Sequence, residues 1–115
     1  MSRPPEFSAV LDRRDDVLHL VLTGELDLAT MVELEAALPS PAPGELLVLD
    51  LRELDFIDSS GLHVFMRLDV ASRAEGWSLA IVRGGPDVQR VLDLIRLGDR
   101  IRTVDAPAEA SPALR

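Results

Sequence analysis

The sequence contains no cysteine, lysine, tyrosine or asparagine, and only two histidines occur among its 115 residues. Without cysteine the chain has no disulfide, no thiolate nucleophile and no Cys-ligated metal. Without lysine it has neither a Schiff-base amine nor the lysine of a P-loop. The histidines, His19 and His63, stand far apart and have no acidic or histidine neighbour at metal-ligand spacing. We therefore expect no enzymatic activity, no metal and no cofactor.

Positive charge is scarce as well. Acidic residues outnumber arginines by 20 to 12, and the formal net charge is −8. This balance argues against binding to nucleic acid and against docking on an anionic membrane, because nothing here neutralises a polyanion. The longest apolar runs, such as residues 46–49, are far shorter than the roughly 20 residues that span a bilayer. The first residues lack the apolar region of a signal peptide, so we expect a cytoplasmic protein.

What is present fits one globular domain. Hydrophobic residues make up 47% of the chain and charged residues 28%, the balance of a soluble domain. We place the domain at residues 7–105. Residues 1–6 and the Ala/Pro-rich residues 106–115 are expected to be flexible termini.

The order of periodic segments predicts an α/β fold. Strands are expected at residues 7–11, 17–22, 46–51, 77–82 and 101–104, and helices at residues 28–38, 58–75 and 86–97. Residues 52–57 are expected to be a connector. The sheet is then mixed: an antiparallel hairpin opens it, and parallel strands joined by right-handed crossovers follow, packed with three to four helices. In the hairpin His19 lies on the face opposite Leu18 and Leu20, where it is a side chain beside the sheet rather than a ligand.

One segment carries chemistry, residues 55–62 (Asp-Phe-Ile-Asp-Ser-Ser-Gly-Leu), which joins a buried strand to a helix N-terminus. Sites in open α/β sheets tend to lie at such positions. Unpaired amides and the helix dipole would stabilise a phosphoryl group on Ser59 or Ser60. Asp58 and the two serines are also preferred helix caps, so on the residues alone simple capping is the stronger interpretation. A Mg²⁺ site formed by Asp50, Asp55 and Asp58 is a weaker alternative.

The second helix has a wide apolar arc. One face (Gly61, Val64, Phe65, Leu68, Ala71) should pack on the sheet, and an adjoining stripe consists of Leu62, Met66 and Val70. The stripe either contacts a protein partner or is covered by neighbouring helices. His63 and Arg67 border it as polar, solvent-facing positions.

Three segments together resemble the signature segments of STAS domains, the sulfate-transporter and anti-sigma-factor-antagonist domains. They are residues 23–27 (Thr-Gly-Glu-Leu-Asp), 47–51 (Leu-Val-Leu-Asp-Leu) and 56–62 (Phe-Ile-Asp-Ser-Ser-Gly-Leu). Residues 82–92 also resemble the family's entry into its third helix. The similarity spans roughly residues 7–105 and implies a small α/β sandwich with a mixed sheet.

The resemblance also implies a mechanism, that of a stand-alone anti-sigma factor antagonist. In such proteins the serine after the motif aspartate, here Ser59 and less so Ser60, is phosphorylated by an anti-sigma factor that is a GHKL-type serine kinase. The unphosphorylated form binds the anti-sigma factor and frees a sigma factor, and a PP2C-type phosphatase restores it. The implied partner-binding residues are Asp27, Asp58, Ser59, Ser60, Gly61, Leu62, His63, Met66 and Arg67. Asp27 matches an acid near the phosphorylation loop, whereas His63 replaces a frequent glycine and bears on the choice of partner.

Two other classes stay open at this point. A STAS subunit bound constitutively to an ABC (lipid) transporter ATPase would have no phosphorylation cycle. An enzyme using the aspartates with Mg²⁺ would hydrolyse a phosphoester.

Overall fold

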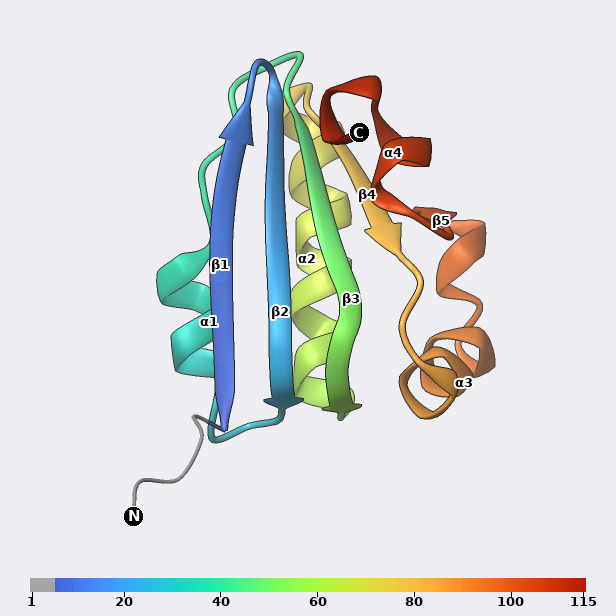
Figure 1. Ribbon diagram of the computed structural model, residues 1–115. Coiled ribbons are helices and arrows are strands. Elements are labelled where there is room, and N and C mark those ends of the chain that lie inside the picture. Colours follow the sequence, from blue (N-terminus) through green and yellow to red (C-terminus); the bar gives the residue numbers. More distant parts are fainter. Residues whose placement is uncertain (1–5) are drawn as a thin grey trace.

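The computed structural model describes residues 6–115 as a five-stranded sheet with helical segments on both faces (Figure 1). What was expected of residues 1–5 lies outside the described residues. The strands are β1 (Phe7–Arg14), β2 (Val17–Leu26), β3 (Leu46–Ile57), β4 (Ser78–Val82) and β5 (Arg102–Val104). The helices are α1 (Met31–Ala37), α2 (Ser59–Glu75), α3 (Pro86–Leu94) and α4 (Pro107–Ala110), with short 3-10 turns at Leu97–Asp99 and Pro112–Leu114.

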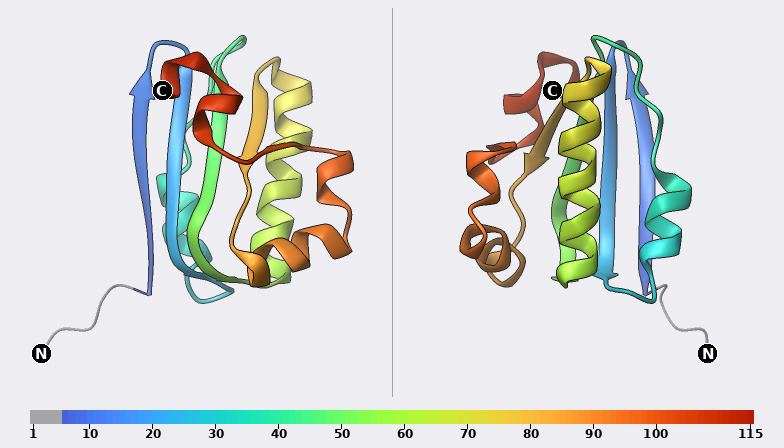
Figure 2. Two further views of the ribbon diagram at one scale, coloured as in Figure 1. Left: turned by 45° about the vertical axis from the view of Figure 1, so that its right-hand side comes forward. Right: turned by 180° about the vertical axis from the view of Figure 1, so that it is seen from behind.

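The sheet is mixed, as predicted, and its strands follow one another in chain order, β1-β2-β3-β4-β5. β1 and β2 form the antiparallel hairpin, and β3, β4 and β5 are added in parallel. Helices α1 and α2 cover one face, whereas α4 lies on the other (Figure 2). Because consecutive side chains point to opposite faces, β2 buries Leu18, Leu20 and Leu22 in the main core toward α2 and presents His19 to the opposite face.

β3 is longer than the sequence indicated, because residues 52–57 continue the strand instead of forming a connector. The pairing with β2 is irregular there, with register shifts between Val21 and Thr23 and between Gly24 and Glu25. Such irregularities break the period of two, so this half of the strand does not show simple alternation of buried and exposed residues. The extension of the strand matters for the site, because β3 ends at Ile57, directly before the N-cap of α2.

The C-terminal segment also differs from the flexible terminus expected at residues 106–115. It forms α4 and the turn Pro112–Leu114, which lie against the sheet face opposite α2 (Figure 2). Ala110 is buried in a second, smaller apolar cluster with Val17, Val48 and Val104. The small side chains that made the segment look unstructured are the ones that allow close packing on the valines of the sheet.

α1 is shorter than the predicted helix at residues 28–38, since residues 27–30 form a hydrogen-bonded turn before it. In contrast, α2 closely matches the predicted helix at residues 58–75. Asp58 caps its start, and Gly76 in the left-handed conformation (φ 80°) follows its last residue. No helix within residues 6–115 is long and apolar enough to cross a membrane.

Candidate functional site at the start of α2

The N-terminus of α2 is capped by Asp58. Its Oδ1 accepts hydrogen bonds from the amides of Ser60 (2.9 Å) and Gly61 (3.3 Å). The capping interpretation is therefore right for the aspartate. It follows that two of the amides expected to receive a phosphoryl group already have a carboxylate partner, and that negative charge is present at the positive end of the helix dipole.

The two serines differ in exposure. Ser59 is exposed and Ser60 is half-buried, and neither hydroxyl is hydrogen-bonded to another of the described residues. Capping thus uses Asp58 and leaves both hydroxyls free for another role. Of the two, Ser59 is the more exposed to solvent.

The loop after β2 lies beside the start of α2. The amide of Asp58 donates to the carbonyl of Leu26 (3.1 Å), which brings Asp27 next to the serine segment. Asp27 Oδ1 accepts from the amide of Thr30 (3.0 Å), and the Thr30 hydroxyl in turn reaches the carbonyl of Glu25 (2.7 Å). Asp27 is therefore near the serines, as expected, with its carboxylate shaping its own turn.

Gly61 allows α2 to approach both strand ends closely. A Cβ at this position would lie 2.8 Å from Leu26 Cδ2 and 2.9 Å from Ile57 Cγ1. Both of these side chains are buried, so neither has room to move aside. The glycine thus fixes the height of the serine segment above the ends of β2 and β3.

Part of the predicted apolar stripe on α2 is exposed. Met66 and Val70 are 40% and 60% exposed, and together with His63, Arg67 and Ala71 they line a shallow apolar hollow. Leu62, the first member of the predicted stripe, is buried in the core and does not belong to this surface. The Arg67 guanidinium is ion-paired with Glu35 of α1, which holds it at the border of the hollow.

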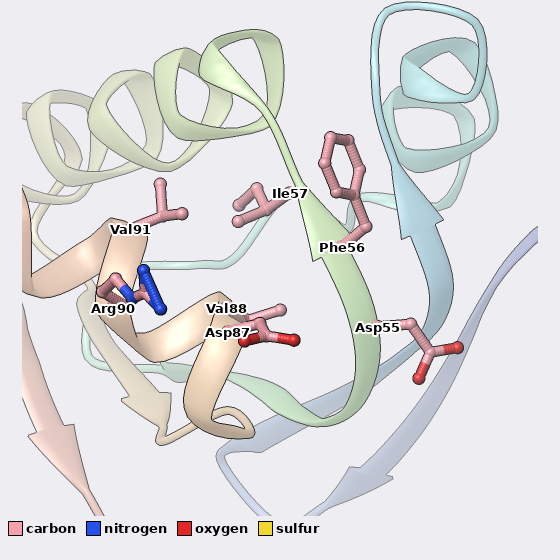
Figure 3. Close-up of a pocket in the computed structure, with 7 residues that line it drawn as sticks. All are labelled: Asp55, Phe56, Ile57, Asp87, Val88, Arg90 and Val91. Atoms are coloured by element: carbon pink, nitrogen blue, oxygen red, sulfur yellow. The ribbon is translucent and has the colours of Figure 1, made fainter.

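A second hollow near the site was not predicted. It lies between the last residues of β3 and helix α3 and is lined by Asp55, Phe56, Ile57, Asp87, Val88, Arg90 and Val91 (Figure 3). Phe56, one of these lining residues, is 46% exposed. Only 3% of the chain is aromatic, and such exposure is unusual for a large aromatic side chain. The aromatic residue in the motif is the available signal, but no pattern in the sequence indicates that β3 contacts α3.

The three aspartates considered as a Mg²⁺ site do not converge. Asp50 is bonded to Arg52 and His19, Asp58 caps α2, and Asp55 is exposed and points away from α3 (Figure 3). Within residues 6–115 no three acidic or histidine side chains are grouped to hold a metal ion.

Asp50 instead belongs to a buried ion pair on the face opposite α2. Its carboxylate is 1% exposed, with Arg52 Nη2 at 2.8 Å and His19 Nε2 at 2.9 Å. Burial alone raises the pKa of Asp50, but the hydrogen bonds from Arg52 and His19 outweigh it, so the pKa lies below its usual value. The same pairing raises the pKa of Arg52. His19 is thus beside the sheet, as predicted, and has a defined acidic partner.

Comparisons with known proteins agree with this architecture. The chain belongs to the STAS domain family, since the family model described as "Mlab, STAS domain" matches residues 9–104. The chain is similar to an anti-sigma factor antagonist from Mycobacterium paratuberculosis whose crystal structure is known. The two share 25% sequence identity with a TM-score of 0.78, and the match covers 100% of this chain and 99% of that one.

A second solved structure supports the fold alone. It is an uncharacterised protein of the DUF3478 family with a SpoIIAA-like fold from Shewanella loihica PV-4, 19% identical, with a TM-score of 0.56. That match covers 100% of this chain and 99% of the other.

Proposed function

We propose that this protein is an anti-sigma factor antagonist that binds its partner through the start of α2 and is switched off by phosphorylation of Ser59. The observation that carries the proposal is an exposed serine with a free hydroxyl directly after the capping Asp58. The likeness to a solved anti-sigma factor antagonist over the whole chain supports it. The partner is a cytoplasmic anti-sigma factor with a GHKL-type serine kinase domain.

The chemistry of the switch is a phosphoryl transfer. The kinase transfers the γ-phosphoryl group of ATP to Ser59 Oγ, which loses its proton, and ADP leaves. A PP2C-type phosphatase hydrolyses the phosphoserine to serine and inorganic phosphate. The chain itself supplies the acceptor hydroxyl and no catalytic group to these steps.

The electrostatics of the site explain why phosphate would break a complex. Phosphorylation adds about −1.5 to −2 charges at pH 7. The Asp58 carboxylate already occupies the amides of Ser60 and Gly61, so those donors do not neutralise the added charge. A partner seated on Ser59 and on the adjoining hollow at Met66 and Val70 would have to bury an unpaired phosphate, which weakens binding by orders of magnitude.

The test compares wild type with Ser59→Asp and the matched Ser60→Asp variant as baits in lysate from the source cells. We expect a GHKL-type kinase to bind wild type and Ser60→Asp and to be lost with Ser59→Asp. With the purified kinase and ATP, Ser59→Ala should abolish phosphate incorporation, whereas Ser60→Ala should not.

Two outcomes would contradict parts of the proposal. Phosphate on Ser60 would overturn the choice of serine. Retention of one partner by all three baits, in particular a transporter ATPase, would overturn the switch and favour a constitutively bound STAS subunit of an ABC (lipid) transporter.

A further inference from the structure

The two edges of the sheet differ in length. β5 is an edge of only three residues, and the Arg102 guanidinium on it bonds two carbonyls of the C-terminal segment. β1 is an edge of eight residues that contains no proline and pairs with β2 without a register shift. α1 packs behind β1, and among the described residues no strand pairs with its outer side (Figure 1). So long and regular an edge is a template for a further strand, because its free amides and carbonyls lie in a row.

The hydrogen bonds of the hairpin show which residues of β1 face the open edge. The amide of Glu25 donates to the carbonyl of Glu6 (2.7 Å), so these two residues form a hydrogen-bonded pair. Such pairs alternate along an antiparallel ladder, and the even-numbered residues of β1 therefore bond β2. The amides and carbonyls of the odd-numbered residues point to the open side and have no backbone partner within residues 6–115; these residues are Phe7, Ala9, Leu11 and Arg13.

The side chains of this edge suit contact with another copy of the same strand. Val10, near the centre of β1, is 62% exposed on the face opposite the main core, where its neighbour on β2 is Val21. Residues 6–14 contain two acidic residues and two arginines, so this stretch is neutral in a chain whose net charge is −8. Two copies of the acidic chain can thus approach along β1 with little repulsion between the strands themselves.

We propose that β1 pairs with β1 of a second copy of this chain, antiparallel, and joins the two sheets across a twofold axis. Odd-numbered residues must then face odd-numbered residues, because these carry the free amides and carbonyls. The register that sets Val10 opposite Val10 of the second copy meets this condition along the whole strand. Phe7 then lies opposite Arg13 of the second copy, and every contact occurs twice. The main-chain hydrogen bonds of such an added strand supply the affinity.

Charge selects this register over its neighbours. It places Glu6 opposite Arg14 of the second copy. Glu6 has no ion pair among the described residues, and Arg14 uses only its Nε, toward Asp12 (2.9 Å). A shift of two residues in one direction would set Glu6 opposite Asp12, and the same shift in the other direction would set Val10 opposite Asp12. Opposite charges across a strand pair stabilise it, whereas like charges destabilise it.

The lack of cysteine in the chain allows a direct test of the register. Val10→Cys places a single thiol opposite its own copy, at the Cα separation of about 4.5 Å that a disulfide can bridge. With oxidised glutathione as the oxidant, we expect a disulfide-linked dimer on a non-reducing gel. Ser8→Cys is the matched control on the same face of the same strand. Its two thiols would lie four residues apart along the strands, about 13 Å, and should stay unlinked.

Sedimentation velocity of the full chain at rising concentration measures association without a cross-link. We expect wild type to pass reversibly from monomer to dimer. Glu6→Arg sets like charges opposite each other at both ends of the strand pair and should weaken the dimer about tenfold. Adding Arg14→Glu to Glu6→Arg restores opposite charges and should recover most of the affinity. Asp99→Arg makes the same change at an exposed position outside β1 and should leave the dimer unchanged.

Four results would overturn the proposal. A wild-type chain that stays monomeric throughout would leave the edge to a strand of a different protein. Equal cross-linking of Val10→Cys and Ser8→Cys would reject the register. A double variant as weak as Glu6→Arg alone, or an Asp99→Arg variant equally weak, would mean that the Glu6 and Arg14 pair does not join the copies. The Ser59 segment follows β3, two strands from this edge, so the test does not depend on the proposed phosphorylation.

Discussion

Two aspartates on either side of the second half of β3 show how the same carboxylate can serve different ends. Asp50 lies inside the strand, is buried, and has both its oxygens bonded to Arg52 and His19. Asp58 lies just past the strand and bonds backbone amides of α2. Asp50, Arg52 and His19 are thus bonded to one another. The cap formed by Asp58, in contrast, leaves the neighbouring Ser59 hydroxyl without a partner among the described residues.

The Asp50 carboxylate therefore stabilises the folded core, whereas the Asp58 carboxylate positions an exposed segment. A buried charge must be paired, because an unpaired one costs several kcal/mol. A capping carboxylate instead fixes the first turn of a helix and leaves nearby side chains available. The free hydroxyl of Ser59 is therefore a result of how Asp58 caps the helix.

The largest expected effect comes from Gly61, which sets the position of the serine segment. Gly61→Val should lower the free energy of unfolding by about 2–3 kcal/mol, since its Cβ would lie 2.8 Å from the buried Leu26 side chain. Urea denaturation followed by circular dichroism measures the loss. Gly85→Val is the control, because a Cβ there meets nothing within 4 Å. Its cost should stay below about 1 kcal/mol, that of a poorer N-cap. Equal losses at both positions would remove the claim that close packing fixes the serine segment.

Much of the fold could be predicted from the sequence. Local rules of periodicity and capping predict the leucines of β2, the Asp58 cap of α2 and the start of α3 at Pro86, and the structure places them as expected. The second half of β3 could not be predicted, because its irregular pairing with β2 removes the alternation that marks a strand. α4 was missed because its burial depends on valines distant in sequence, such as Val17 and Val48.

The candidate site divides in the same way. The Asp58 cap is predicted from the residues, because a cap at a helix start is a local feature, whereas the choice of Ser59 over Ser60 comes from the family resemblance. The neighbourhood of Asp27 came from the family resemblance, and its physical basis is the hydrogen bond between the Asp58 amide and the Leu26 carbonyl. The hollow that Phe56 lines together with α3 depends on a tertiary contact that no local pattern reveals.

The pairing of Asp50 with Arg52 and His19 predicts that the free energy of unfolding depends on pH. Asp50→Asn should cost about 1.5 kcal/mol at pH 7, because bonds to a charged acceptor become bonds to a neutral one. Folding lowers the pKa of Asp50. Its contribution to stability is therefore fully present at a pH above the pKa of the unfolded chain, about 3.9, and is lost as the pH falls through the lower pKa of the folded protein.

The measurement is urea denaturation of wild type and Asp50→Asn between pH 7 and pH 3. The difference between them should be constant from pH 7 to about pH 5 and should narrow below about pH 4. Asp55→Asn, at an exposed carboxylate, should match wild type throughout. A difference that does not narrow in acid would mean that the asparagine disturbs packing and not the ion pair.

The smallest effects are expected at Asp58 and Ser59, the second side of the comparison. Asp58→Ala should cost about 1 kcal/mol, the usual value of a lost helix cap, because two amides lose their acceptor. Ser59→Ala should change the free energy of unfolding by less than about 0.5 kcal/mol, since it removes an exposed hydroxyl without a partner among the described residues. Both variants are measured by urea denaturation at pH 7. A loss at Ser59 as large as that at Asp58 would show that the hydroxyl stabilises the helix, and the separation between a structural cap and a free acceptor would then fail. A neutral Ser59→Ala would mean that the hydroxyl does not stabilise the fold.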